Sequence, residues 1–356
     1  MNSFLPSLFE IPPAPVARRT LRLYGRYDVA LLGPEEFLDA VADHFWPQAA
    51  PVATVPGMPL VELLRGRSRP SALTGHEQQP ITLHHAPDGD APDSNEGIHY
   101  PTAAGVDRLV ADPRTGSFVA VSGSRIQVVN ADAELGLRDA LRVVEQLVST
   151  GFEAEGVHTL HASAFAVGGG AVAVSGPKGS GRTTTTLAAV AAGARLVGNE
   201  RLYARTDDAS TTVWGWTDPV RLVDAASAAR TVLPLSRYLS GDATRLALGP
   251  LPLAAVVVPR VGAATVPIRC EELDPAAGRA AIGAEVLPPR ARWLGLEPQA
   301  APSAATPVAP RYLRLSYGHR DAAAAAALLL DVLGAPAQPG AQPLVGGPFD
   351  GHAGAF

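Results

Sequence analysis

The segment at residues 175–186, SGPKGSGRTTTT, combines glycines, cations and hydroxyl side chains at the spacing of a phosphate-binding loop. Gly176, Gly181 and Thr183 match the pattern G-x-x-x-x-G-K-[ST]. Glycines let backbone N–H groups surround phosphate oxygens, the following helix adds the positive end of its dipole, and the threonine hydroxyl is a ligand for Mg²⁺. The segment predicts a nucleotide site with ATP and Mg²⁺ as cofactors. The residues expected to bind the nucleotide are Gly176, Lys178, Gly179, Ser180, Gly181, Arg182, Thr183 and Thr184.

The loop departs from the pattern at Arg182, which occupies the lysine position. Lysine reaches phosphates as a compact point charge, whereas arginine carries a wide planar fork, so the exchange is not conservative. Lys178 is the only lysine of the chain and lies four residues earlier. Variant loops that use an upstream lysine place it five residues before the usual position, so Lys178 is off by one.

The surrounding elements have the order that such a loop requires. The apolar run at 171–176 predicts the strand before the loop, and 183–194 predicts the helix after it. A tight GGG turn at 168–170 joins this strand to a preceding one at 161–167, and 195–197 predicts the next short strand. The β-branched run at 252–260 predicts a buried central strand.

The remaining segments predict a mixture of strands and helices. We expect strands within 19–33 and 106–130, and helices at 34–46, 59–66, 133–152 and 320–334. Residues 84–97 predict an exposed loop, where His84 and His85 are solvated rather than metal ligands. Trp214 and Trp216 suggest a solvent-facing strand edge or a lid over the site, with packing as the alternative to ligand contact.

Composition bounds the class of protein. The chain has 356 residues, of which 47% are hydrophobic, and this predicts a globular protein. A net charge of −5 argues against nucleic acid as a partner. The single cysteine, Cys270, excludes an intramolecular disulfide and fits a reducing cytoplasm. The N-terminus does not read as a signal peptide and no apolar run is long enough to span a membrane, so we expect a soluble, cytoplasmic protein.

The stretch LHASAFAVGGGAVAVSGPKGSGRTTTTLAAVAAGARLVGNER resembles the HPr kinase/phosphorylase family and its HPr-kinase-like relatives. The histidine, the loop and an acidic-pair position follow in the order and spacing of that family. The resemblance covers about residues 107–260 and does not extend to 1–100. It implies that His161 lies near the reacting phosphate. It also implies that Asn199 and Glu200 occupy the acidic pair, whose first member is the base and whose second helps to hold Mg²⁺ together with Thr183.

Asn199 is the more serious departure from the family. An amide cannot accept a proton at neutral pH, and general-base catalysis is worth roughly 10²–10⁴ in rate. Since both Arg182 and Asn199 depart, we expect an HPr-kinase-like protein with a degenerate active site and weak or vestigial nucleotide binding. Its partner is then a peptide or protein, such as a precursor peptide of ribosomal natural-product biosynthesis, because HPr-kinase-like relatives accompany such gene clusters.

The alternative is an active ATP-dependent kinase for a hydroxyl of a peptide, protein or small molecule. Arg182 keeps a cation, Thr183 is intact and Glu200 keeps one carboxylate. The kinase family forms oligomers, so the resemblance also implies a homo-oligomer.

The expected fold class is α/β. A kinase-like phosphate-loop core, with a mixed or parallel central sheet flanked by helices, accompanies a smaller α+β domain. The expected boundaries are 1–104 for an N-terminal domain that docks a partner or peptide, 105–334 for the phosphate-loop domain, and 335–356 for a disordered Pro/Gly-rich tail.

Overall fold

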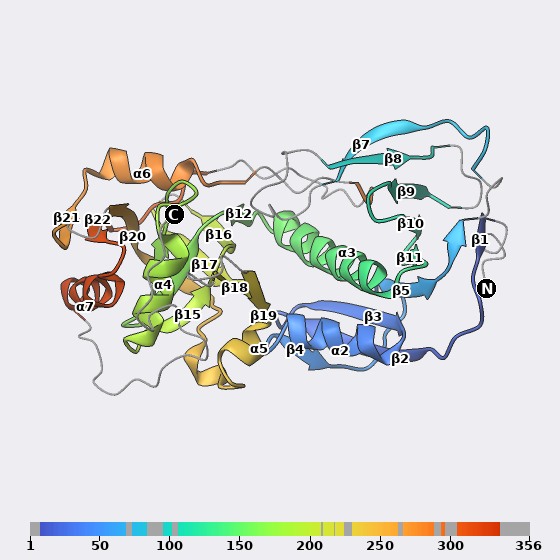
Figure 1. Ribbon diagram of the computed structural model, residues 1–356, viewed down its shortest axis with the longest axis horizontal. Coiled ribbons are helices and arrows are strands. Elements are labelled where there is room, and N and C mark those ends of the chain that lie inside the picture. The colour runs from blue at the N-terminus through green and yellow to red at the C-terminus, as the bar shows by residue number, and fades with distance from the viewer. Residues whose placement is uncertain are drawn as a thin grey trace. The chain divides into compact units, whose positions relative to one another are not determined.

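The computed structural model contains two compact units (Figure 1). Unit 1 comprises residues 1–154 with 289–300, and unit 2 comprises 155–288 with 301–356. Within these ranges the structure describes residues 8–68, 73–83, 95–101, 106–207, 209–216, 218–223, 230–262, 266–287, 293–295 and 305–334. His84, His85 and the tail at 335–356 lie outside the described residues.

Unit 1 is built on a nine-stranded sheet in the order β4-β2-β3-β5-β11-β10-β9-β8-β7, with a small separate pair of β1 and β6. Two helices, α2 and α3, pack against its strands. The strands are β1 (Phe9–Glu10), β2 (Ala17–Leu23), β3 (Tyr27–Gly33), β4 (Ala49–Pro51), β5 (Leu60–Arg65), β6 (Arg67–Ser68), β7 (Gln79–Leu83), β8 (Asn95–His99), β9 (Arg108–Asp112), β10 (Ser117–Ser122) and β11 (Arg125–Asn130); the helices are α2 (Glu35–His44) and α3 (Ala133–Ala154).

The boundary of unit 1 differs from the one expected at residue 104. The three strands predicted within 106–130 form, but they belong to the N-terminal sheet. β9 pairs with β8, and β11 pairs in parallel with β5. Because each strand of a sheet takes its hydrogen-bond partners from its neighbours, β9–β11 cannot be separated from unit 1. The division therefore falls after Ala154.

The helix expected at 59–66 is wrong, because these residues form β5. This strand lies between β3 and β11 and pairs with both in parallel. Glu62 interrupts the apolar run of this strand. In the structure Glu62 is 1% exposed, and its carboxylate accepts two hydrogen bonds from the Arg125 guanidinium and one from the Gln127 amide. A charge-assisted pair of this kind permits a carboxylate inside a sheet.

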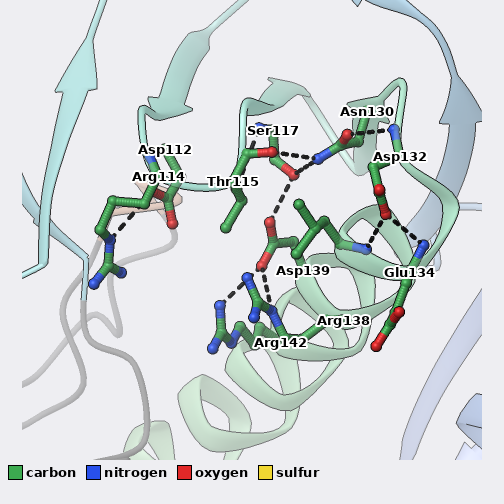
Figure 2. Close-up of polar contacts among 11 residues, drawn as sticks. Asp112, Arg114, Thr115, Ser117, Asn130, Asp132, Glu134, Arg138, Asp139 and Arg142 are labelled. Atoms are coloured by element: carbon green, nitrogen blue, oxygen red, sulfur yellow. Dashed lines mark hydrogen bonds and ion pairs between the residues drawn. The ribbon is translucent and has the colours of Figure 1, made fainter. Parts of the chain in front are cut away.

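A polar network holds the start of α3 against the β9–β10 turn (Figure 2). Asp132 caps the helix by accepting hydrogen bonds from two backbone N–H groups of its first turn, at 2.9 Å each. Asn130 donates to the Ser117 hydroxyl at 2.6 Å, and this hydroxyl donates to the buried carboxylate of Asp139 at 2.6 Å. Arg142 neutralises Asp139 at 2.9 Å. Each polar group has a partner in the network, which identifies it as a structural anchor of the helix.

Unit 2 contains a mixed sheet in the order β12-β16-β17-β20-β14-β13-β15, with β22 pairing β20 and β21 beside this path, and a separate β18–β19 pair. The strands are β12 (His158–Leu160), β13 (Ser163–Val167), β14 (Gly170–Val174), β15 (Arg195–Gly198), β16 (Leu202–Thr206), β17 (Thr211–Gly215), β18 (Val220–Val223), β19 (Arg230–Leu233), β20 (Leu251–Gly262), β21 (Arg269–Glu272) and β22 (Arg311–Gly318); the helices are α4 (Arg182–Ala191), α5 (Leu235–Tyr238), the short 3-10 helix η1 (Ala243–Arg245), α6 (Pro275–Gly283) and α7 (Ala322–Val332).

The centre of unit 2 is β20, which corresponds to the run expected at 252–260. It pairs in parallel with β14 and β22 and antiparallel with β17. Apolar side chains of β13, β14 and β20 share one core, and α4 packs beside α7 (Figure 1). The mixed α/β class is thereby confirmed.

The tryptophans of β17 do not form an exposed edge or a lid. Trp214 is 6% exposed and Trp216 is fully buried. The Trp216 ring packs against Tyr203 at 5.0 Å and lies under the Arg201 guanidinium, also at 5.0 Å. Their role is packing within unit 2. None of the described helices is long and apolar enough to cross a membrane.

Candidate functional site

The residues expected to bind phosphate meet at one edge of the unit 2 sheet. Ser163 at the start of β13 pairs with Val174 at the end of β14, and Ala164 pairs with Gly198 at the end of β15. The loop after β14, the residues before β13 and Asn199 after β15 therefore emerge together. Since neighbouring strands lie about 4.8 Å apart, the ends of β14 and β15 are separated by roughly 10 Å.

All three glycines of the loop from 175 to 181 have positive φ, and two of them lie near the left-handed region. Gly179 has φ 83° and Gly181 has φ 97°, in the region that other residues avoid. A Cβ at Gly181 would also collide with a Val261 methyl group and come within 3.0 Å of the Tyr317 hydroxyl. The Tyr317 hydroxyl in turn contacts the Thr185 hydroxyl at 2.8 Å. Gly181 thus begins α4 where the helix packs closely on β20 and β22.

The predicted nucleotide-binding residues line this loop and the first turn of α4. Gly176 is buried, Lys178 and Gly179 form an exposed tip, and Ser180, Gly181, Arg182, Thr183 and Thr184 are partly buried. The Ser180 hydroxyl is buried and has no hydrogen-bond partner among the described residues. The start of α4 presents backbone N–H groups, which favour an anion at a helix N-terminus. Binding of nucleotide at these positions stays a prediction.

Arg182 folds back onto the protein rather than into solvent. Its Nη1 lies 2.8 Å from the Gly176 carbonyl oxygen, 3.0 Å from the His161 carbonyl oxygen and 2.9 Å from Oε2 of Glu285. Its Nη2 lies 2.9 Å from Nε2 of His161. The side chain is 13% exposed. Both terminal nitrogens of the guanidinium fork therefore already have acceptors inside the protein.

His161 connects the same groups. Its backbone N–H donates to the Glu285 carbonyl at 2.8 Å, and its Nδ1 lies 3.3 Å from the Glu285 carboxylate. Nδ1 also lies 3.4 Å from Nη1 of Arg182, and the shorter contact of Nε2 with this cation requires Nε2 to accept, so we infer that Nδ1 carries the proton. Burial, then the Arg182 charge, lowers the pKa of His161 to about 4, against a smaller opposing effect of Asp218. The imidazole is neutral at pH 7.

Glu285 and Asp218 were not identified from sequence. Glu285 follows α6, is 13% exposed, and has its pKa raised by burial although Arg182 opposes the shift. Asp218 is buried and forms a two-point ion pair with Arg201, whose Nε lies 2.7 Å from Oδ2. Glu285 stands 103 positions after Arg182 in an ordinary helix-end context, so no local pattern indicates it.

Asn199 and Glu200 lie at the sheet edge, directly after β15. The Asn199 residue is 1% exposed, and neither its amide oxygen nor its amide nitrogen has a hydrogen-bond partner in the described part of the chain. Its backbone carbonyl accepts from the Ser163 hydroxyl. Glu200 is partly exposed. Across the described residues there is no cluster of three or more His, Cys, Asp or Glu side chains placed to hold a metal ion, so the Mg²⁺ roles of Thr183 and Glu200 stay predictions.

No known family model matches the sequence, and no curated protein matches it. Among solved structures, the HPr(Ser) kinase/phosphatase from Coxiella burnetii is similar to this chain, with 11% sequence identity and a TM-score of 0.27. The match covers 49% of this chain and 92% of the other. This similarity is distant and assigns no role to any residue of this chain.

Proposed function

We propose that this protein is an HPr-kinase-like phosphate-loop protein with a degenerate site, which binds nucleotide weakly and acts by binding a peptide or protein partner. The observation that carries the proposal is the buried amide of Asn199, at the sheet edge where the resemblance requires a base. It is 1% exposed and cannot accept a proton at neutral pH.

His161 does not replace the missing base. Its imidazole is neutral, but Nε2 faces the Arg182 guanidinium at 2.9 Å, and Nδ1 carries the proton toward Glu285. A base must reach the proton that it removes. The nitrogen that has a lone pair is therefore directed at a cation and not at an incoming hydroxyl.

Support for a peptide partner comes from the family resemblance and from unit 1. HPr-kinase-like relatives accompany gene clusters for modified peptides, and a precursor peptide is an extended chain. In unit 1, β4 and β7 end the nine-stranded sheet and pair on one side within the described strands. An extended peptide binds such an edge by adding a strand.

An active kinase is the second candidate, and specific residues favour it. Thr183 lies in the first turn of α4, and Glu200 keeps a carboxylate beside Asn199. Phosphoryl transfer depends chiefly on positioning and charge stabilisation, so one carboxylate and one hydroxyl retain part of what it requires.

Calorimetric titration of MgATP distinguishes the two. For a degenerate loop we expect a dissociation constant of about 1 mM or weaker, corresponding to about −4 kcal/mol. Thr183→Ala should change it little, and Thr212→Ala, a partly buried threonine of β17, serves as the matched control. Micromolar binding that Thr183→Ala abolishes, with transfer of labelled phosphate that Glu200→Gln abolishes, would establish the kinase instead.

The peptide half of the proposal needs its own measurement. We expect a labelled precursor peptide to bind the full chain in a fluorescence anisotropy titration without nucleotide. Thr82 pairs with Glu96 of β8, whose N–H faces β9, so the Thr82 N–H lies on the unpaired side of β7. Thr82→Pro removes this donor and should weaken binding if this edge is used, whereas Val55→Pro outside the sheet should not. Equal binding by both variants would exclude the β7 edge.

A further inference from the structure

The ion pair between Arg182 and Glu285 places a carboxylate beside the first residue of α4, where residues 175–181 lead into the helix; we call this place the mouth of the loop. We propose that Glu285 is an internal anion that competes with phosphate for the Arg182 guanidinium and keeps the loop closed to phosphate-bearing ligands. The inference rests on the proposed function, in that it takes residues 176–183 to be a phosphate loop. It assigns a role to a residue that the family resemblance does not include.

The position of the carboxylate is the first step. Arg182 is the first residue of α4, so its guanidinium lies where the loop and the helix dipole favour negative charge. Glu285 Oε2 is 2.9 Å from Nη1 of this guanidinium. Carboxylate and phosphate oxygens make the same charge-assisted hydrogen bonds to a guanidinium fork. The carboxylate therefore fills a coordination place that a phosphate oxygen would take.

The second step is that the backbone of Glu285 is fixed. Its carbonyl accepts from the His161 N–H at 2.8 Å, and its own N–H donates to the Ile282 carbonyl at 3.1 Å, so α6 leads directly into this position. The next residues continue along β12, with an isolated bridge between Val286 and Leu160. The carboxylate is held by this frame, and it can leave Arg182 only by rotation of its side chain.

The third step concerns charge. His161 is neutral, so Glu285 and Arg182 balance each other at the mouth of the loop. A di- or trianionic phosphate that enters gains the Arg182 contact but then lies beside an anion that is 13% exposed. Repulsion between like charges at contact distance in a partly buried site is large compared with thermal energy. Binding must therefore be penalised unless the charge at residue 285 is removed.

Glu285→Gln tests this step directly, because it keeps the shape and one acceptor oxygen of the side chain while removing its charge. We expect inorganic tripolyphosphate with Mg²⁺, titrated calorimetrically at pH 8, to bind this variant at least about tenfold more tightly than the wild type. Glu272→Gln is the matched control, since Glu272 also pairs with an arginine of unit 2, Arg311 at 2.7 Å, but is 59% exposed and makes its ion pair with an arginine outside the loop. It should leave the affinity unchanged.

The double variant Arg182→Ala with Glu285→Gln identifies the cation involved. The gain should disappear in this background, because the freed guanidinium is absent. An unchanged or weaker affinity in Glu285→Gln alone would overturn the proposal and would identify Glu285 as a residue that positions Arg182 for phosphate. A gain that survives the loss of Arg182 would also overturn it.

Glu285→Asp provides a second route if the glutamine variant does not fold. The shorter side chain draws the carboxylate away from Arg182, and we expect at least about a threefold gain in tripolyphosphate affinity; no gain in a folded protein overturns the proposal. The proposed function fails separately. Micromolar MgATP binding and phosphate transfer by the wild type would refute it whatever Glu285→Gln does, whereas millimolar binding in every variant would leave it standing and refute the role of Glu285.

Discussion

His161 is a partly buried imidazole with Arg182 beside Nε2 and Glu285 beside Nδ1, and its pKa differs from that of a free histidine. Burial and Arg182 lower its pKa from 6.5 to about 4. Between these values the unfolded chain binds more protons than the folded one, so this group makes the folded state more stable as the pH rises from 4 to 6.5. Allowing for its 29% exposure, the contribution is about 2 kcal/mol.

Comparison with His161→Gln isolates this contribution. Hydrogen exchange of the β13–β14 hairpin, measured at pH 4.5 and 6.5, should gain more protection with pH in the wild type than in the variant. The raised pKa of Glu285 acts in the opposite direction above pH 4.5 and is present in both proteins, so it cancels in the difference to a first approximation. Parallel pH profiles would show that the imidazole is more solvated than the structure indicates.

Asn199 offers a second test at a single residue. Asn199→Asp would bury a carboxylate at a position that is 1% exposed, where the amide that it replaces has no hydrogen-bond partner in the described residues. A buried charge without compensation raises its own pKa and destabilises the fold by several kcal/mol at most. We expect a lower melting temperature at pH 8 than at pH 5, relative to wild type. Asn199→Ala, which adds no charge, should show no such dependence on pH.

The residues of the site differ in whether a short sequence pattern indicates them or only the folded structure brings them together. Gly176, Gly181 and Thr183 belong to one local pattern of eight positions, and the structure places them together in the loop and the first turn of α4; their binding of phosphate stays a prediction. The contacts of Arg182 could not be predicted from the sequence. Its partner Glu285 lies 103 positions away, and its distance from Arg182 depends on how α6 returns along β12.

Gly181, where the loop leads into α4, allows the contributions of backbone conformation and packing to be separated. Gly181→Ala should lower the free energy of unfolding by about 2–3 kcal/mol, because its Cβ would collide with Val261 and because the backbone has φ 97°. Gly179→Ala is the matched control, with φ 83° but open space around a Cβ, and should cost about 1 kcal/mol. Hydrogen exchange of the α4 amides, followed at increasing denaturant concentration, measures the loss of stability in both variants. Equal costs would show that strain in φ alone, and not packing on β20, requires glycine at 181.

Elements with one clear periodicity were predictable. The hairpin β13–β14, helix α4 and strand β20 appear where apolar runs and turn residues indicated them. β5 was not predicted. The partner that accommodates its buried Glu62 carboxylate comes from β11, more than sixty positions away. Periodicity reports the solvent exposure of a segment, but it does not report the neighbours that satisfy a buried charge.

The division into two units was the least predictable feature. The family resemblance begins near 107, which suggested a boundary at 104, yet residues 106–154 complete the N-terminal sheet and its long helix. Unit 1 also recruits residues 293–295, which follow most of unit 2 in the chain. Arg108 Nε donates to the Trp293 carbonyl at 2.6 Å, and Leu294 is 1% exposed. Such a return of the chain leaves no trace in local composition.

This return predicts that a substitution late in the chain destabilises the N-terminal unit. Leu294→Ala should cost about 2–4 kcal/mol, because it empties a buried site. In the full chain, hydrogen exchange should increase across β9–β11 and leave β13–β14 unchanged. Val232→Ala, at a position 56% exposed, is the control and should alter neither. Increased exchange confined to β13–β14 would contradict the division into units, since Leu294 would then stabilise unit 2, whose segments lie on both sides of it in the sequence.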